Sequence, residues 1–263
     1  MASRRPPPKW LIASRKAGRG EVHDWVSRAL SRSGVLPFKE AEAAVHAGRV
    51  ALDGRKVKEP LTPLQPSSVL TLDGAQVTLH SRTLVLAFHK PKGVVTATVD
   101  QHDGAGTVFE VLRAALPAEL HQYGWHAVGR LDRDTTGLLL FTNDERFVAH
   151  ATQPDTHLPK RYLARVGGAV TEAKLEKLRA GIKLGEALTR PSQARAREKD
   201  VVELVLTQGR YHQVKQMLNA VGLPTLELHR EAIGSLVLDV EPGAARLLSD
   251  DEVRERLGYE PRR

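Results

Sequence analysis

Residues 129–137 read Gly-Arg-Leu-Asp-Arg-Asp-Thr-Thr-Gly, and residues 138–142 continue without a break as Leu-Leu-Leu-Phe-Thr. The apolar run is typical of a short buried strand, and the glycine-bounded polar residues before it are typical of a loop at the edge of a core. A buried strand fixes the loop that enters it, so the carboxylate of Asp132 would be held rigidly beside a cleft. Neighbouring arginines would favour its ionised form. Taken alone, an Arg-x-Asp sequence is more often a charged surface turn.

The same stretch resembles the central motif of the pseudouridine synthases, in the RsuA-like branch that modifies ribosomal RNA. In that family a Gly-Arg-Leu-Asp loop is followed by a charged residue, by Asp-Thr-x-Gly and by an apolar strand, and residues 129–142 match at each of these places. The similarity extends from about Val22 to the C-terminus. Lys90-Pro91-Lys92-Gly93 resembles the opening of the family's catalytic domain, and residues 209–217 (Gly-Arg-Tyr-His-Gln-Val-Lys-Gln-Met) resemble its third motif.

The resemblance implies roles for four side chains. Asp132 would be the essential carboxylate, acting as nucleophile or as base, and Arg130 would fill the gap left by a flipped base. Tyr162 would stack on the target base, since a flat ring can hold uracil by its face. Lys215 would pair with Asp132 and keep it ionised. By pattern alone, a strand tyrosine is more often a core residue and a helix lysine a surface residue. The implied isomerisation is redox-neutral and requires no cofactor.

The composition favours a polyanionic partner. The chain has 263 residues, a net charge of +8 and a pI near 9.8, which is typical of proteins that bind nucleic acid. Six basic and no acidic residues occupy the first 20 positions, so the remainder carries a net charge of only +2 and would bind RNA through local patches. Pro6-Pro7-Pro8 cannot enter a helix and like charges repel, so residues 1–20 are predicted to form a flexible arm. Phosphate binding and a solubilising role are equally compatible with this arm.

We expect three parts: the basic arm (1–20), a small module (21–81) and a catalytic domain (82–263). The module should contain two helices. The first has an apolar face formed by Val22, Trp25, Val26, Ala29 and Leu30. The second follows Pro37, with Phe38, Ala41 and Val45 inward and Gly48 at its C-terminal cap. Asp53-Gly54 and Asp73-Gly74 each lie between short runs of alternating apolar and polar residues, which is a strong signal for a hairpin.

Two helices followed by short strands, with Gly48-Arg49-Val50 and Leu52-Asp53-Gly54-Arg55, resemble the alpha-L RNA-binding motif. The module differs from that motif at residues 36–39, Leu-Pro-Phe-Lys, where the family usually places Ser-Arg-Arg. Basic side chains in this hairpin would bind phosphate with little sequence preference. Across the whole chain, the residues expected to contact RNA are Arg49, Arg55, Lys56, Lys58, Lys90, Lys92 and Arg210.

The catalytic domain is predicted to be α+β, with a mainly antiparallel mixed sheet. We expect strands at 84–88, 138–142, 160–166 and 201–206, and helices at 107–112, 146–152 and 170–184. Val214, Met217, Leu218 and Val221 define the buried face of a further helix that Gly222 would end. Ser249-Asp250-Asp251-Glu252 is a capping box that opens a terminal helix ending at Gly258.

Several classes of site are excluded by composition. The chain has no cysteine, so disulfides, thiolate metal sites and cysteine nucleophiles are absent. The eleven histidines are scattered, and no metal site is expected. No apolar run reaches membrane-spanning length, so a cytoplasmic monomer without membrane contact is predicted, with ribosomal RNA or a ribosomal-subunit assembly intermediate as partner.

The favoured function is isomerisation of a uridine in small-subunit ribosomal RNA, and large-subunit ribosomal RNA stays open as a substrate. Two alternatives from other functional classes remain. A glycoside hydrolase could use Asp132 and Asp134 as a carboxylate pair. Residues two apart usually face apart, however, and basic neighbours oppose the raised pKa that a general acid needs. A non-catalytic ribosome-assembly factor could share the fold, and it would be favoured if Asp132, Tyr162 and Lys215 did not converge.

Overall fold

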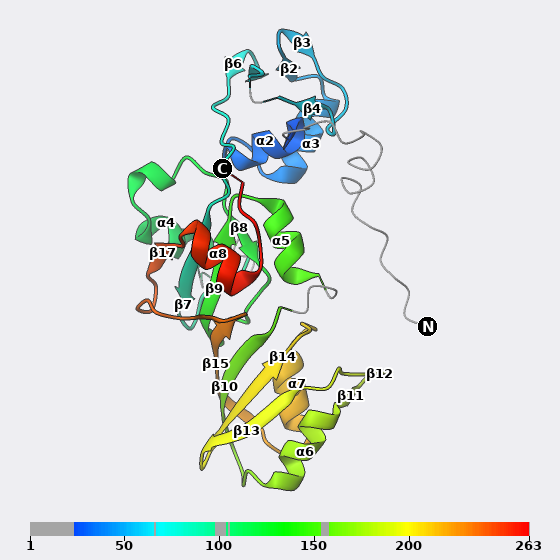
Figure 1. The fold of residues 1–263 in the computed structure, drawn as a ribbon, viewed down its shortest axis with the longest axis vertical. Coiled ribbons are helices and arrows are strands. Elements are labelled where there is room, and N and C mark those ends of the chain that lie inside the picture. The colour runs from blue at the N-terminus through cyan, green and yellow to red at the C-terminus, as the bar shows by residue number, and fades with distance from the viewer. Residues whose placement is uncertain (1–23, 66, 98–103, 105, 154–157, 263) are drawn as a thin grey trace. The chain divides into compact units, whose positions relative to one another are not determined.

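The computed structural model describes residues 24–65, 67–97, 104, 106–153 and 158–262 (Figure 1). The chain forms two compact units. The first takes in the described residues up to Arg82 together with Ala118–Trp125, and the second contains the described residues of 83–117 and 126–262. The predicted arm at residues 1–20 lies outside the described residues. Among the described helices, none has both the length and the apolar character needed to cross a membrane.

Among its described residues, the first unit contains two α-helices, one short 3-10 helix, a two-stranded sheet and two hairpins. Its helices are α2 (Val26–Arg32), α3 (Phe38–His46) and the short 3-10 helix η1 (Ala118–Leu120). Its strands are β1 (Asp24–Trp25), β2 (Val50–Leu52), β3 (Arg55–Lys56), β4 (Pro63–Leu64), β5 (Leu70–Leu72) and β6 (Ala75–Gln76). Strands β2, β3, β5 and β6 form one antiparallel sheet in the order β3-β2-β5-β6.

Both Asp-Gly hairpins predicted from the sequence are confirmed. In each turn the aspartate and the glycine have positive φ angles, 49° and 77° at Asp53-Gly54 and 51° and 84° at Asp73-Gly74. Two successive left-handed residues match the right-handed twist of the strands that they join. Gly48 also follows α3 with φ 70°, as expected of a C-terminal cap.

The first helix begins later than the apolar spacing predicted. Trp25 is extended, with φ −113° and ψ 144°, and belongs to β1, which pairs with β4. Its side chain is nevertheless buried, and the unit has an apolar core of its own. That core is formed by apolar side chains from α2, α3 and the two hairpins: Val26, Leu30, Ala41, Val45, Val50 and Leu70.

Ala118–Trp125 is the part of the predicted catalytic domain that the structure assigns elsewhere. Gly124 approaches α2 so closely that an added Cβ would lie 1.8 Å from the carbonyl oxygen of Ser31. The amide of Gly124 donates to the carbonyl of Arg32, and the ring of Tyr123 lies 4.3 Å from that of His80. These contacts join residues that are far apart in the sequence, so no local sequence pattern predicts them.

The second unit is built on a nine-stranded sheet with the order β13-β14-β10-β15-β9-β7-β17, while β16 pairs with β15 and β8 with β9. The strands are β7 (Val85–Lys90), β8 (His126–Val128), β9 (Thr136–Thr142), β10 (Lys160–Val166), β13 (Gln193–Glu198), β14 (Val201–Leu206), β15 (Thr225–Ile233), β16 (Leu236–Val237) and β17 (Ala245–Leu247). Among the described residues, every pairing of strands in this sheet is antiparallel except that of β15 with β9. The predicted α+β class with a mainly antiparallel mixed sheet is therefore confirmed.

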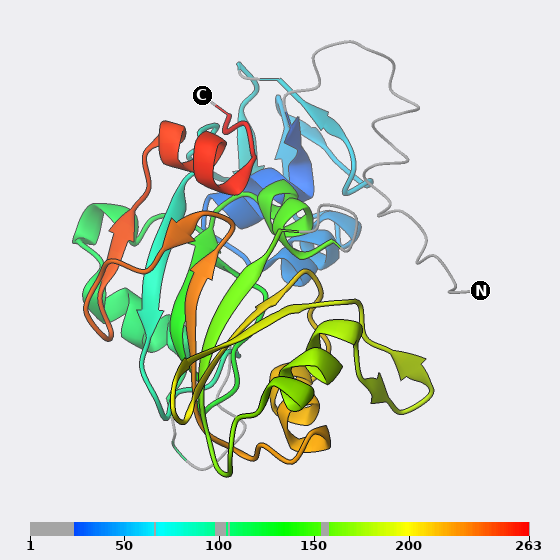
Figure 2. The same cartoon turned by 60° about the horizontal axis from the view of Figure 1, so that its bottom comes forward.

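The helices of this unit are α4 (Val108–Ala115), α5 (Glu145–Thr152), α6 (Glu172–Ala180), α7 (Gln213–Ala220) and α8 (Asp250–Leu257). The helix expected at 170–184 is shorter, because Gly181 has φ 101° and turns the chain back. A small hairpin of β11 (Lys183–Leu184) and β12 (Ala187–Leu188) follows and extends away from α6 (Figure 2). The predicted capping box at Ser249 and Glu252 is present.

The sheet of the second unit has two halves with separate cores. Helices α6 and α7 cover the half formed by β10, β13 and β14, whereas α5 and α8 pack on the half formed by β7, β8 and β9 (Figure 1). The halves meet where β15 runs parallel to β9, and that pairing has only two registered residue pairs, His229 with Thr136 and Arg230 with Gly137. The loop at residues 129–135 enters the sheet at this junction.

Candidate active site

The loop that carries Asp132 is fixed by hydrogen bonds from the segment after β7. Leu131 is buried, and Thr96 Oγ1 donates to its carbonyl at 2.8 Å and accepts from its amide at 3.3 Å. The amide of Gly93 donates to the carbonyl of Arg133 at 2.8 Å, and the amide of Thr135 donates to that of Asp132 at 3.1 Å. A carboxylate on this loop is therefore held by backbone contacts on both sides.

Lys90 is part of this support and does not contact RNA as the sequence analysis expected. Its side chain is fully buried. Its ammonium donates to the carbonyls of Pro91 (3.0 Å), Arg133 (3.2 Å) and Thr135 (2.8 Å), two of which belong to the Asp132 loop. Burial lowers the pKa of Lys90 to about 8. A lysine that is buried and donates to three carbonyls cannot reach a phosphate, so it acts as a tether for the loop.

Asp132 lies between two cationic or ionisable partners from the third motif. Lys215 Nζ is 3.1 Å from Asp132 Oδ2 and 2.5 Å from Asp134 Oδ1, and His212 Nε2 is 3.2 Å from Asp132 Oδ1. The ion pair predicted between Asp132 and Lys215 is therefore present. Burial opposes the charge on Lys215, but hydrogen bonds to Asp134 and Asp132 outweigh it and raise its pKa. The hydrogen bond from Lys215 lowers the pKa of Asp134.

Helix α7 presents Lys215 to the loop. Val214, Met217 and Leu218 are buried against the sheet, which leaves Lys215 beside the buried face in the first turn. The residue before the helix, His212, has a left-handed backbone with φ 49° and ψ 28°. A non-glycine residue in this conformation is uncommon and is held by its surroundings. Its ring stacks on Tyr211, with centroids 3.8 Å apart.

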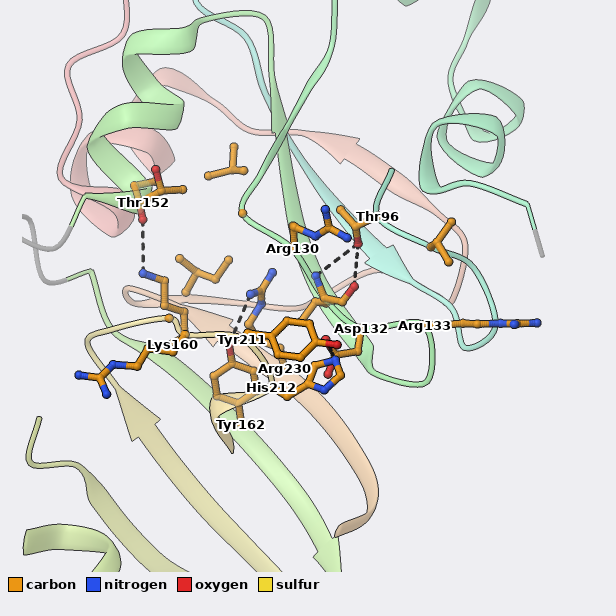
Figure 3. Close-up of a pocket in the computed structure, with 18 residues that line it drawn as sticks. Thr96, Arg130, Asp132, Arg133, Thr152, Lys160, Tyr162, Tyr211, His212 and Arg230 are labelled. Carbon is orange, nitrogen blue, oxygen red and sulfur yellow. Dashed lines mark hydrogen bonds and ion pairs between the residues drawn. The ribbon is translucent and has the colours of Figure 1, made fainter. Parts of the chain in front are cut away.

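A cavity of about 750 Å³ opens beside Asp132 (Figure 3). Figure 3 shows Asp132 and His212 next to each other on one side of the cavity, with Lys160 on the opposite side and Tyr162 and Arg230 between them. Lys215 lines a smaller adjoining hollow together with Asp132 and Tyr162. The residues that line the main cavity include Thr96, Arg130, Asp132, Lys160, Tyr162, Arg210, Tyr211, His212, Arg230 and Ile233.

Tyr162 reaches the cavity because of its place in the sheet. Strand β10 pairs with β15 through a register irregularity between Arg161 and Tyr162, and Tyr162 lies opposite Arg230. The guanidinium of Arg230 lies 6.0 Å from the centre of the Tyr162 ring. A half-buried ring in the wall of a cavity can hold a flat ligand by its face.

Comparison with known proteins adds to this geometry. The family model described as RNA pseudouridylate synthase matches residues 84–220. Ribosomal small subunit pseudouridine synthase A of Yersinia pestis is 34% identical over 233 residues, covering 87% of this chain and 94% of that protein. The enzyme of the same name from Vibrio cholerae serotype O1 is 36% identical over 219 residues, covering 82% and 91%. A solved structure described as a pseudouridylate synthase is 28% identical with a TM-score of 0.62, covering 89% and 99%.

The chain belongs to the RNA pseudouridylate synthase family. In this pseudouridine synthase, the three residues that the sequence analysis expected to converge do so, since Asp132, Tyr162 and Lys215 line one hollow. Arg130 lines both that hollow and the main cavity, with an exposed side chain. Their individual roles in catalysis stay predictions.

The residues expected to contact RNA differ in their exposure and in the contacts that they make. In the first unit, Arg55, Lys56 and Lys58 are exposed, while Arg49 forms a hydrogen-bonded ion pair with Asp73 at 2.5 Å. In the second unit, Lys92 is exposed. The guanidinium of Arg210 donates to the carbonyls of Ala187 and Leu188 in the β11–β12 hairpin. RNA contact by these residues stays a prediction, with Lys90 removed from the set.

Sequence reasoning missed four residues of this pseudouridine synthase site: Thr96, Lys160, His212 and Arg230. His212 lies in the quoted stretch 209–217, three residues before Lys215, and Lys160 begins the strand expected at 160–166. Thr96 carries no local signal. Within the part of the chain that the structure describes, no group of three or more His, Cys, Asp or Glu side chains is placed to hold a metal ion.

Proposed function

We propose that this protein isomerises a uridine in ribosomal RNA to pseudouridine, and that the small-subunit RNA is its substrate. The observation that carries the proposal is the convergence of a cation-bound carboxylate, Asp132, with the ring of Tyr162 at one cavity. The substrate assignment is supported by relatives that are named as ribosomal small subunit pseudouridine synthases. Such a protein works in the cytoplasm, on the RNA alone or in a subunit assembly intermediate.

The reaction rearranges one nucleotide without gain or loss of atoms. The bond between C1′ of the ribose and N1 of uracil breaks, and a bond between C1′ and C5 forms. The proton on C5 leaves, and N1 gains a proton. Between these events the uracil must turn while it stays bound, which requires that the base be flipped out of the RNA and held.

The residues at the cavity divide this work. The Asp132 carboxylate, held between Lys215 and His212, acts either as a nucleophile or as a proton acceptor, toward the ribose or the uracil. Tyr162 holds the uracil by its face, and Arg130, exposed at the rim, occupies the space that the flipped base leaves. Exposed basic side chains, among them Lys92 and the β2–β3 hairpin, bind phosphate and position the RNA.

The two alternatives have less support. A glycoside hydrolase needs one carboxyl group with a raised pKa as its general acid. Asp132 and Asp134 instead share one lysine, and the pKa of Asp134 is lowered. A non-catalytic assembly factor has no need for a carboxylate with two partners beside an aromatic ring. The convergence of Asp132, Tyr162 and Lys215 therefore favours the enzyme.

The test is release of tritium from an rRNA transcript that carries [5-³H]uridine, because each isomerisation frees the C5 hydrogen. Asp132→Asn should lower the rate by at least about 10³-fold, because loss of a residue that acts at the reacting atoms can cost about 10⁴–10⁶-fold, while RNA affinity stays within about two-fold because phosphate contacts are retained. Asp134→Asn is the matched control, since it removes a neighbouring carboxylate from the same lysine. A wild-type protein that releases no tritium, or an Asp132→Asn variant that keeps most of the rate, would contradict the proposal.

A further inference from the structure

Arg230 is a buried cation whose charge no carboxylate balances among the described residues. The side chain is 4% exposed, and no ion pair with Asp or Glu is formed within the described ranges. Its Nε donates to the carbonyl of Leu138 at 2.7 Å, and its Nη1 lies 3.5 Å from the hydroxyl of Tyr162. Burial of an unbalanced charge is costly, so proteins keep such groups mainly where a negative charge must be met.

One nitrogen of this guanidinium lacks a hydrogen-bond partner among the described residues. Arg230 Nη2 is buried and has no hydrogen-bond partner in the described part of the chain, and Arg230 lines the main cavity. Figure 3 shows the guanidinium inside the group of lining residues, above Tyr162 and between Lys160 and Arg130. A buried N–H group left without an acceptor costs about 1–3 kcal/mol, so its position needs an explanation.

Lys160 strengthens the positive character of this side of the cavity. It also lines the cavity and donates to the carbonyl of Ala151 at 3.3 Å. Burial, followed by the positive charge of Arg230, lowers its pKa to about 8. Asp132, which pairs with Lys215, lies on the other side of the cavity in Figure 3, so the cavity has a carboxylate end and a cationic end.

The register of the sheet relates Arg230 to a base held on Tyr162. The two residues lie opposite each other on β15 and β10, and directly opposite residues point to the same face of a sheet. A flat base stacked on the Tyr162 ring would therefore have an edge beside the guanidinium. Phosphates, in contrast, remain with the backbone at the exposed rim, and Arg230 is too deeply buried to meet them there.

The proposed reaction needs a positive group at that edge. Cleavage of the bond between C1′ and N1 leaves an electron pair on uracil that is delocalised onto its carbonyl oxygens. Addition of a nucleophile at C6 also places negative charge on a carbonyl oxygen, through C5 and C4. Both roles left open for Asp132 in the first step thus develop charge on the base, and a preorganised donor stabilises such charge.

We propose that Arg230 is a catalytic residue, whose Nη2 donates to a carbonyl oxygen of the target uracil and stabilises the negative charge that develops on the base. Lys160 is a positioning residue that adds to the positive potential around Arg230. This inference rests on the proposed function, because it assumes a uracil in the cavity. It assigns the cationic end of the cavity to a carbonyl edge of the base.

The test compares Arg230→Gln and Arg230→Lys with the wild type on an rRNA fragment under single-turnover conditions. Removal of one charge-stabilising donor typically costs about 10²–10³-fold in rate, so Arg230→Gln should lose that much, with RNA affinity within about three-fold. Arg230→Lys should recover part of the rate. Arg161→Gln is the matched control, because Arg161 lies on β10, pairs with Glu231 at 2.6 Å and is not among the cavity residues.

A second substrate separates catalysis from a purely structural role. Fluorine at C5 withdraws electrons and stabilises negative charge on the ring by itself. The loss caused by Arg230→Gln should therefore be at least about 10-fold smaller, about 1.4 kcal/mol, for consumption of 5-fluorouridine than for uridine at the target. Equal losses on both substrates, or a loss confined to RNA affinity, would overturn the role of Arg230 and leave the proposed function standing. Failure of the wild type to form pseudouridine would instead contradict the proposed function itself.

Discussion

Replacement of Lys90 by methionine tests how the Asp132 loop is held. The change keeps an unbranched side chain of similar length but removes an ammonium that donates to three carbonyls. Hydrogen bonds to a charged group contribute about 1.5–3 kcal/mol each, so three amount to about 5–9 kcal/mol. Against this, the pKa of Lys90 falls from 10.5 to about 8, which corresponds to a cost of about 3 kcal/mol for the buried charge.

The difference is a net destabilisation of about 2–6 kcal/mol for Lys90→Met. For a unit of this size, about 3 kcal/mol lowers Tm by roughly 6–12 °C. The effect on stability should also depend on pH. Between about pH 8 and 10.5 the unfolded chain keeps the Lys90 proton that the folded chain has lost, so the stability of the wild type relative to Lys90→Met rises with pH across this window. Below pH 8 both states are protonated and the difference is constant.

The assay is thermal and urea unfolding at pH 7.5 and 9.5, together with tritium release. A displaced loop should lower the rate by about 10²-fold, because small misplacements of a catalytic group have effects of this size. Lys92→Met is the control, since Lys92 is the exposed lysine of the same turn; it should weaken RNA binding in a salt-dependent way and leave Tm unchanged. If Lys90→Met unfolded like the wild type and lost only salt-dependent RNA affinity, Lys90 would be a phosphate contact and the reasoning would be wrong.

Further predictions follow from other contacts. Lys215→Met should raise the pKa of Asp134 toward 3.8, as measured by carboxyl NMR titration. In the wild type the lowered pKa of this carboxyl adds stability above about pH 3.8, and this stability is lost as the pH falls. The difference in unfolding free energy between the wild type and Lys215→Met that comes from this carboxyl should therefore disappear in acid. Tyr162→Phe should keep most of the rate, whereas Tyr162→Leu should lose about 10–100-fold, since stacking contributes about 1–3 kcal/mol; equal rates would exclude stacking. Gly137→Ala should destabilise the protein by at least about 2 kcal/mol in urea unfolding, because its φ is 111° and a Cβ would lie 2.3 Å from a backbone oxygen. The double substitution Arg55→Gln and Lys56→Gln should make the slope of log affinity against log salt concentration shallower by about 0.7–0.9 for each phosphate contact that is lost. The rate of tritium release at saturating RNA should not change.

Local features of this protein were determined by the sequence alone. The two Asp-Gly turns, the glycine that ends α3 and the Ser249 capping box depend on a few neighbouring residues, and each is present as expected. The apolar face of α7 was readable for the same reason, and with it the place of Lys215. The family motif identified Asp132, because the chemistry of a site constrains a short stretch more strongly than packing does.

The tertiary structure decided what depends on distant partners. Lys90 and Lys92 are alike in a basic turn, and only the packing of β7 against the Asp132 loop buries the first and exposes the second. Ala118–Trp125 joined the first unit through the close approach of Gly124 to α2. Arg230 reads as one charge in an alternating strand, and its burial beside Tyr162 follows from strand pairing between residues 68 positions apart. Burial and pairing of this kind are properties of the whole sheet, so no local pattern of residues carries them.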